Sequence, residues 1–230
     1  MGYHMQLIER EPRESARDYA LRAIKFNIVN MTFLPRSKIN DHEIATNLGI
    51  SRTPVREALI ELSKYGLVEM FPQKGSIIAP VSYRMIREAA VTREILECGA
   101  VSRCCSIEDT SAFSNLTEIL DLTQFYVDRA EIDKSSDLDV AYHKELFRLA
   151  GMTTAHEFLT NLEIHYRRII TLSYDGSADH DYVSEHQKIL DAIMSRNEEK
   201  AVAEMKKHLN LEKMNKARIL EIYPDCVIDA

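Results

Sequence analysis

Several features are missing from this 230-residue sequence, and each absence excludes a class of protein. No stretch reaches the roughly 18 consecutive apolar residues that a membrane-spanning helix needs. No basic segment followed by an apolar one opens the chain, so we expect a cytoplasmic protein rather than an exported one. Glycine (7) and proline (6) are scarce and tryptophan is absent, while 45% of the residues are hydrophobic. This composition is typical of a folded, mainly helical chain.

Cysteine is also rare, with four residues: Cys98, Cys104, Cys105 and Cys226. They form no CxxC pair and no spacing typical of a disulfide-linked scaffold, so we expect reduced thiols. The pair His4-Met5 is typical of a cloning remnant, although an ordinary N-terminus stays an equal alternative. Residues 1–5 are therefore left out of the predicted fold.

The charge is unevenly distributed along the chain. In total, 29 Lys and Arg stand against 36 Asp and Glu, and this net charge of −7 argues against a uniformly basic nucleic-acid binder. Residues 1–80 hold 11 basic and 9 acidic residues, whereas residues 81–230 hold 18 and 27. A first third of net charge +2 and a remainder of net charge −9 predict two domains with different partners.

The first third begins with two predicted helices. Residues 14–30 have apolar side chains at three- and four-residue spacing, which predicts a helix, and Leu34-Pro35 belongs to the loop that follows it. Asn40 is a suitable cap for a short helix over residues 41–48. Gly49 is expected to end that helix in the left-handed conformation.

A third helix and a hairpin follow at once. Either Ser51 or Thr53 is suited to cap the helix, and Gly66 ends it. The runs 67–71 and 76–80 are short and strand-like, with a turn between them. Two helices joined by a tight turn and followed by a hairpin form the outline of a winged helix-turn-helix.

From Ser82 onward the pattern shows no strand and predicts a succession of helices. These helices cover residues 83–106, 109–131, 136–150, 153–173, 179–195 and 198–221. Asn197 is a good cap for the last of them, and Ser136 with Asp139 forms a start that resembles a capping box. Helices of this length and number predict an all-α bundle.

Together these patterns predict a mainly α protein with two domains. Residues 6–80 are expected to form a winged helix-turn-helix domain with a small β-hairpin wing. Residues 81–230 are expected to form an all-helical domain for effector binding and dimerisation. The boundary falls near Pro80-Val81-Ser82.

The stretch ISRTPVREAL, residues 50–59, concentrates polar and cationic groups on the first turn of a helix. The free N–H groups and positive dipole end of a helix N-terminus attract phosphate. Arg52 and Arg56 are four residues apart and share one face, where a guanidinium can bind guanine or phosphate. The alternative is that both are solvated and pair with Glu57 and Glu61. The surrounding helix-turn-helix and wing favour DNA binding.

Residues 14–80 closely resemble the DNA-binding domain of the GntR family of bacterial transcription regulators. The matching run is LPRSKINDHEIATNLGISRTPVREALIELSKYGLVEMFPQKGSIIAPVS. The resemblance implies contacts to operator DNA from His42 at the start of one helix, from Ser51, Arg52, Thr53 and Arg56 on the next, and from Lys74 and Gly75 at the wing tip. Arg36 departs from the family pattern, which usually has glycine after the proline, and it adds a cation.

Three histidines and one aspartate in the remaining part have the composition of a metal site. Asp139 and His143 are four residues apart on a predicted helix, so both face the same way and form a chelating pair. His186 and His208 lie on two later helices, and their spacing leaves open whether they reach this pair. Three imidazoles and one carboxylate suit Zn²⁺, Ni²⁺, Fe²⁺ or Mn²⁺ better than Ca²⁺ or Mg²⁺.

Residues 83–220 resemble the all-helical FCD effector domain that accompanies this DNA-binding domain in FadR-type regulators. The matching pieces are TREILECGAV, DLDVAYHKELFRLAG, EHQKILDAI and NEEKAVAEMKKHL. The resemblance implies a divalent metal bound by Asp139, His143, His186 and His208, and a small organic acid bound with its help. An octahedral ion with four protein ligands keeps coordination positions for a carboxylate.

Three further residues are candidates for contacting the effector. Arg93 matches a family position that often faces the pocket, where it would neutralise a carboxylate. A salt bridge with Glu97, four residues on, is an equal alternative. His165 and Arg168 lie on a helix predicted to face the pocket, with a polar core position as the alternative for His165.

The sequence therefore predicts a homodimeric transcription regulator whose operator affinity is controlled by a small carboxylate at a metal site. Two-fold protein symmetry matches two DNA half-sites, and both repression and activation stay open. One alternative is a metal-ion sensor, in which the ion itself is the signal. A metal-dependent enzyme is less favoured, because no general base accompanies the cluster and the HExxH motif is absent.

Overall fold

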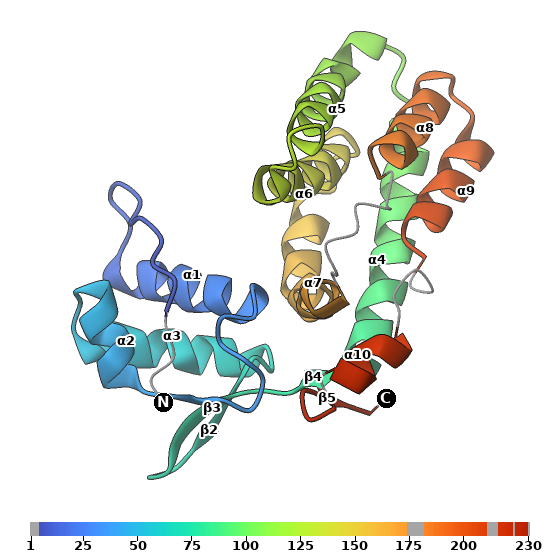
Figure 1. Cartoon of the computed structure of the whole chain (residues 1–230). Helices are drawn as coiled ribbons and strands as arrows, with labels where there is room; N and C mark the ends of the chain where they lie inside the picture. Colours follow the sequence, from blue (N-terminus) through green and yellow to red (C-terminus); the bar gives the residue numbers. More distant parts are fainter. Residues whose placement is uncertain (1–4, 174–181, 211–215, 223, 230) are drawn as a thin grey trace. The chain divides into compact units, whose positions relative to one another are not determined.

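Figure 1 shows the computed structural model of the chain, which describes residues 5–173, 182–210, 216–222 and 224–229. Contacts between residues divide the chain into two compact units. The first consists of Met1–Arg87, Asn161–Asp175 and Met214–Ala230, and the second of Glu88–Thr160 and Gly176–Lys213. The predicted domain boundary near Pro80 stays a prediction. The two compact units are defined by contacts, and each combines separate stretches of the chain, so they do not test a single boundary in the sequence.

The N-terminal part of the first unit begins with three helices. They are α1 (Ala16–Val29), α2 (Asp41–Leu48) and α3 (Arg52–Lys64). The Asn40 side chain caps α2 by accepting a hydrogen bond from the backbone N–H of His42. Gly49 ends α2 with φ +65°, a left-handed conformation that glycine adopts without strain. The short turn after Gly49 confirms the predicted helix-turn-helix.

The wing is a three-stranded antiparallel sheet in the order β1-β3-β2. Its strands are β1 (Lys38–Ile39), β2 (Val68–Phe71) and β3 (Gly75–Ile78). Val68 pairs with Ile78 and Phe71 with Gly75, so β2 and β3 form the hairpin that the sequence predicts. The two residues of β1 are too few to show an alternating pattern, which is why the sequence does not predict this strand.

A second pair of strands joins two distant parts of the first unit. β4 (Val81–Ser82) pairs in parallel with β5 (Val227–Ile228), which follows α10 (Lys216–Ile222). The backbone N–H of Val81 donates to the Cys226 carbonyl oxygen at 2.8 Å. The expectation that no strand follows Ser82 is therefore wrong. A strand of two residues leaves no periodic signal in the sequence.

The core of the first unit lies beneath the inner face of α3. Ile24 and Ile28 of α1 and Val55 and Leu62 of α3 are each at most 1% exposed. Met5, which the sequence analysis leaves outside the fold, is 4% exposed and belongs to the same core. Because this apolar face of α3 is buried, its polar face is the one left to solvent.

The remaining helices are α4 (Tyr83–Cys104), η1 (Thr110–Phe113), α5 (Ser114–Val127), α6 (Ile132–Leu149), α7 (Thr153–Ser173), α8 (Tyr182–Met194) and α9 (Glu198–His208). All except the first residues of α4 and the last part of α7 belong to the second unit. There α5 packs against α6, and α8 packs against α9 (Figure 1). The helix predicted over 198–221 ends earlier, with α9, and residues 211–215 lie outside the described residues.

Two predicted helix starts are wrong. The helix expected from residue 109 begins as the short 3₁₀ turn Thr110–Phe113, and α5 starts only at Ser114. α6 starts at Ile132, so Ser136 lies inside the helix instead of capping it. Ala130 has φ +55°, which is in the left-handed region, so the chain changes direction after α5 at this residue. The next helix can therefore begin before Ser136.

The second unit has its own apolar core. Tyr142 and Phe147 of α6, Ile189 of α8 and Met205 of α9 are all 0% exposed within it. Asn197 caps α9 as predicted, and its side chain accepts from the backbone N–H of Lys200. This packing fixes the faces that α6, α8 and α9 turn toward one another.

Within the described ranges, no helix has both the length and the apolar character needed to cross a bilayer. All four cysteines are free thiols. Cys104 and Cys105 are buried in the core of the second unit, and burial raises the pKa of Cys104 to about 12. A thiol in such apolar surroundings is unreactive, in line with the reduced state predicted from the sequence.

Candidate nucleic-acid interface and metal centre

The N-terminal end of α3 presents polar groups to solvent. Val55 and Leu62 are at most 1% exposed, whereas the Arg52 and Arg56 side chains are 51% and 60% exposed. Ser51 is the N-cap residue, but its side chain makes no capping hydrogen bond. The N–H groups in the first turn of α3 are therefore a favourable place for a phosphate oxygen.

All seven residues predicted to contact DNA are exposed. They are His42, Ser51, Arg52, Thr53, Arg56, Lys74 and Gly75. Asp41 of α2 was not among the predicted residues, yet its carboxylate binds two of them. Its Oδ1 lies 2.8 Å from Arg52 Nη2, and its Oδ2 lies 2.5 Å from Arg56 Nε. The alternative partners Glu57 and Glu61 form no ion pair with these arginines within the described part of the chain.

The tip of the wing exposes Lys74 and Gly75. The backbone N–H of Lys74 donates to the Phe71 carbonyl oxygen at 3.1 Å, which closes a tight turn. Gly75 has φ +90°, and no heavy atom lies within 4 Å of the place where a Cβ would stand. Backbone conformation, and not packing, therefore favours glycine here. An exposed lysine on this narrow hairpin is well suited to a DNA phosphate.

Arg36, which follows Pro35, adopts a left-handed conformation although it is not glycine. Its φ is +64°, a left-handed conformation that costs a non-glycine residue about 1–2 kcal/mol. The Arg36 backbone N–H donates to the Ile78 oxygen at 2.8 Å, and its Nε donates to the Asp225 oxygen at 2.5 Å. The side chain thus links this turn to the C-terminal tail.

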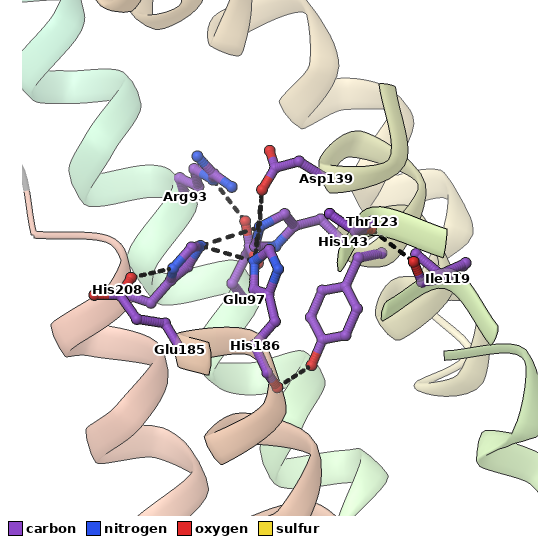
Figure 2. Close-up of polar contacts among 10 residues, drawn as sticks. Arg93, Glu97, Ile119, Thr123, Asp139, His143, Glu185, His186 and His208 are labelled. Atoms are coloured by element: carbon purple, nitrogen blue, oxygen red, sulfur yellow. Dashed lines mark hydrogen bonds and ion pairs between the residues drawn. The ribbon is translucent and has the colours of Figure 1, made fainter. Parts of the chain in front are cut away.

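The four predicted metal ligands meet in the second unit, and Figure 2 shows their side chains pointing toward one another. Asp139 and His143 come from successive turns of α6, His186 comes from α8, and His208 from the end of α9. One donor atom of each lies within 4.8 Å of the others. Nε2 of His186 is 3.1 Å from Nε2 of His208 and 3.3 Å from that of His143. Asp139 Oδ1 is 3.5 Å from the same His186 atom.

This arrangement fits a transition-metal ion. With metal–nitrogen distances of about 2.1 Å, neighbouring ligands are about 3.0 Å apart in octahedral geometry and about 3.4 Å apart in tetrahedral geometry. The three nitrogen–nitrogen distances of 3.1, 3.3 and 3.3 Å lie between these values. Nδ1 of His143 and of His208 each faces a carboxylate, which places the proton there and leaves the Nε2 lone pairs facing one another. A cation among these lone pairs removes their repulsion.

Two glutamates support the histidines from outside, a role that the sequence did not predict for either of them. Glu97 of α4 contacts His143 Nδ1, and a Glu185 carboxylate oxygen lies 2.9 Å from His208 Nδ1. Glu97 is 1% exposed. Burial alone would raise the pKa of Glu97, but its contacts with His143 and Arg93 outweigh burial and hold that pKa below its usual range. Ionised partners of this kind fix the orientation of metal-binding imidazoles.

Arg93 forms the salt bridge with Glu97 that was one of its two predicted roles. The distance between Arg93 Nε and Glu97 Oε1 is 2.6 Å. Arg93 also acts on the cluster: burial opposes ionisation of Asp139, but the imidazoles and Arg93 outweigh burial and lower the pKa of that carboxyl. The guanidinium therefore lies close enough to the candidate metal centre to influence an anion there.

His186 is the most enclosed of the three histidines, at 1% exposure. The Tyr142 ring stacks on its imidazole with a centroid distance of 4.2 Å, and the Tyr142 hydroxyl donates to the His186 carbonyl oxygen at 2.9 Å. Burial, followed by the neighbouring imidazole of His143, holds the pKa of His186 well below its ordinary value. The neutral imidazole that results is the form that binds metal.

His165 and Arg168 do not join this cluster, because they lie on the part of α7 that belongs to the first unit. His165 Nε2 is 2.8 Å from the Tyr65 carbonyl oxygen, and Arg168 Nη2 donates to the Ala79 carbonyl oxygen at 2.6 Å. The two side chains are 2% and 0% exposed. Backbone carbonyl oxygens of the first unit thus hold both side chains, and their predicted contact with an effector stays a prediction.

Comparison with known proteins matches both parts of the chain. The family of bacterial regulatory proteins named gntR matches residues 18–78, and the FCD domain matches residues 88–211. The HTH-type transcriptional repressor RspR of Escherichia coli K12 is 26% identical over 199 residues, which cover 86% of this chain and 87% of the relative. An HTH-type transcriptional regulator from the TAR-I ttuE-ttuC' intergenic region of Agrobacterium vitis is 34% identical over 143 residues, 60% of this chain and 81% of the relative.

Solved structures support the fold. Escherichia coli McbR/YncC has a TM-score of 0.75 at 18% identity and covers 91% of this chain and 99% of its own. A GntR protein from Rhodococcus sp. RHA1 has a TM-score of 0.71 at 24% identity, with coverage of 90% and 98%. The matched families and relatives are transcription regulators and not enzymes. The chain therefore belongs to the GntR family of bacterial transcription regulators, with an N-terminal DNA-binding helix-turn-helix followed by an FCD domain.

Proposed function

We propose that this regulator binds its operator as a homodimer and that a small carboxylate, bound at a divalent transition metal in the FCD domain, controls its operator affinity. The observation that carries the proposal is the convergence of four metal-ligand atoms within 4.8 Å, in a chain that also has an exposed winged helix-turn-helix. The metal ligands in this proposal are Asp139, His143, His186 and His208. The ligand set suits Zn²⁺, Ni²⁺, Fe²⁺ or Mn²⁺.

On the DNA side, α3 enters the major groove with its N-terminus toward the bases. Arg52 and Arg56 supply guanidinium groups for guanine edges or phosphates, and exposed hydroxyls beside them suit phosphate oxygens. The wing reaches the adjacent minor groove. The complete set of operator contacts in the proposal is His42, Ser51, Arg52, Thr53, Arg56, Lys74 and Gly75.

On the effector side, a bound metal supplies a Lewis-acidic centre that a carboxylate coordinates. Arg93, held by Glu97, neutralises the remaining charge of the effector. Effector binding then shifts the population of DNA-binding-competent conformations, because it favours the conformation to which it binds more tightly.

The test begins with the full chain purified without chelator. Elemental analysis measures bound metal, and mass spectrometry identifies co-purifying organic acids. Duplexes selected by the protein from a random-sequence library then serve as operator in gel-shift titrations with and without the identified acid. We expect the acid to change the operator affinity of the wild type but not of His143→Ala. Selective DNA binding that no acid and no chelator alters would contradict the effector part, and absence of selective binding would contradict the whole proposal.

A metal-ion sensor is the second candidate. The burial of two of the ligands favours it, since His143 and His186 are 4% and 1% exposed. If chelation alone switches operator affinity in the same gel-shift assay, and no organic acid changes it further, the ion itself is the signal.

Homodimer formation is supported by apolar side chains on the surface of the second unit. Val91 and Ile95, one turn apart on α4, are 60% and 66% exposed, and Phe125 of α5 is 45% exposed. A second copy that covers α4 removes this apolar surface from water. Light scattering should give a dimer mass for the wild type and for the surface control Lys144→Glu. The double variant Val91→Glu/Ile95→Glu should give a monomer mass.

A further inference from the structure

Asp41 is an acidic residue at the proposed DNA-binding surface, and electrostatic attraction between the protein and DNA phosphate does not explain why it lies there. Its carboxylate lies in the first turn of α2, on the surface that carries Arg52 and Arg56, and its side chain is 18% exposed. A negative charge at a DNA-binding surface repels phosphate. Residues 1–80 have a net charge of only +2, so one acidic residue is a considerable part of the local charge.

One carboxylate binds both arginines. The Asp41 Oδ1 and Oδ2 atoms lie 2.8 and 3.1 Å from Arg52 Nη2, and Oδ2 lies 2.5 Å from Arg56 Nε. Burial alone would raise the pKa of Asp41, but the hydrogen bonds from Arg56 and Arg52 outweigh it and lower that pKa. The ionised group on α2 thus holds two long side chains from successive turns of α3.

These contacts use only some of the N–H groups of each arginine. Arg56 binds Asp41 through Nε and Arg52 through Nη2, so both Nη nitrogens of Arg56, and Nε and Nη1 of Arg52, make no contact with Asp41. Among the described residues, no further acceptor binds either guanidinium. A planar edge with two N–H groups is the part of arginine that binds O6 and N7 of guanine. A side chain that is already held also loses less conformational entropy when it binds.

We propose that Asp41 is a positioning residue that orients Arg52 and Arg56 and thereby sets the preference of the regulator for its operator over other DNA. This inference rests on the proposed contact of both arginines with DNA. Loss of the carboxylate has two consequences of opposite sign. Affinity for any duplex rises because a repelling charge is lost, and discrimination between duplexes falls because the arginines are no longer held. A purely structural acid at the start of α2 affects stability without changing discrimination.

The test compares Asp41→Asn with Glu43→Gln in the full chain. Both changes remove one negative charge from the first turn of α2, but Glu43 makes no ion pair with either arginine within the described ranges. Duplexes selected by the wild type from a random-sequence library serve as operator, and shuffled duplexes of equal composition serve as reference. We expect Asp41→Asn to bind shuffled duplexes severalfold more tightly and to lose about tenfold in operator preference. Glu43→Gln should keep the wild-type preference.

The outcomes separate the inference from the function on which it rests. Equal operator preference for Asp41→Asn and Glu43→Gln, with both variants folded by circular dichroism, overturns the positioning role. Asp41→Glu keeps the charge and should keep most of the preference. Arg52→Ala and Arg56→Ala should lose preference, whereas Arg148→Ala, a matched arginine paired with Glu145, should not. If the Arg52 and Arg56 variants keep full preference, the proposed function and the inference both fall; if only Asp41→Asn keeps it, the inference alone falls.

Discussion

The orientation of His143 depends on the buried carboxylate of Glu97. One oxygen of Glu97 contacts His143 Nδ1, and the other accepts a hydrogen bond from Arg93. An ionised carboxylate only accepts hydrogen bonds, so the imidazole proton lies on Nδ1 and Nε2 keeps its lone pair for the cluster. Loss of such an outer partner lowers metal affinity by about 10- to 100-fold in other metal sites.

We expect Glu97→Gln to weaken Zn²⁺ binding by about 10- to 100-fold, because the amide no longer holds the Nδ1 proton with a full negative charge. Titration calorimetry on chelator-treated full chain measures the affinity, and far-UV circular dichroism checks the fold. Glu94→Gln changes an exposed glutamate on the same helix and should leave the affinity unchanged. Equal affinities for the two variants would show that Glu97 does not position His143.

Sequence spacing predicts residue contacts only within one helix. Asp139 and His143 are four residues apart on α6, so their common face followed from the helical repeat. The approach of His186 and His208 depends on how three helices pack, and only the family resemblance suggested it. Glu97 had no signal of its own, because one buried glutamate does not differ in sequence from the many exposed acids of a chain with 36 of them.

Among the elements, the cluster connects three helices of the second unit. α6, α8 and α9 each contribute at least one ligand atom, although α8 and α9 are separated from α6 by more than thirty residues of chain. A ligand that binds only the folded state stabilises it by about 2.7 kcal/mol at a concentration 100-fold above its Kd. Metal binding in the proposed site would therefore stabilise the packing of these helices.

Metal removal should lower the melting temperature. We expect chelator-treated protein to melt about 5–10 °C below the same protein with Zn²⁺ at 100-fold excess over Kd, given a shift of about 2–4 °C per kcal/mol for a chain of this size. Differential scanning fluorimetry measures both states. His143→Ala should melt at one temperature with or without Zn²⁺. A full shift in this variant would place the stabilising metal elsewhere in the chain.

The same substitution should have opposite effects at two glycines. Gly49 ends α2 with φ +65°, whereas Gly99 lies inside α4, and an added Cβ meets no heavy atom within 4 Å at either position. The backbone conformation at each glycine therefore determines whether alanine stabilises or destabilises the protein. Gly49→Ala should destabilise by about 1–2 kcal/mol, and Gly99→Ala should stabilise by about 0.5–1 kcal/mol. Urea unfolding followed by circular dichroism measures both, and changes of equal sign would contradict this account.

The length of an element decided whether the sequence predicted it. α7 was predicted at its exact bounds, Thr153–Ser173, because twenty-one residues show the helical repeat clearly. β1 and β5 have two residues each and carry no repeat at all. The capping motif correctly predicted the start of a helix at Asn40. It gave a wrong start at Ser136, because the same polar residues also occur inside helices.

In the whole chain, two of the three segments outside the family matches meet each other. The matches cover residues 18–78 and 88–211, which leaves residues 1–17, the linker between the matches and the C-terminal tail. β4 lies in this linker and β5 in this tail, and the two strands pair. The Ser82 hydroxyl is also 3.1 Å from Asp229 Oδ2. The family pattern therefore contained no information about this contact, and the short strands gave none either.

The tail should protect the linker from solvent exchange. Removal of residues 226–230 deletes β5 and the carbonyl that accepts the hydrogen bond of the Val81 N–H. We expect the amide exchange of a peptide covering residues 79–84 to rise by roughly five- to tenfold, since one hydrogen bond contributes about 1 kcal/mol. Removal of residue 230 alone keeps β5 and the contact between Ser82 and Asp229, and should leave exchange nearly unchanged. Equal exchange in both truncated chains and the wild type, measured by mass spectrometry, would mean that the linker keeps its conformation without the tail. Protection that depends on β5 would show that the tail stabilises the first unit through residues 81–82.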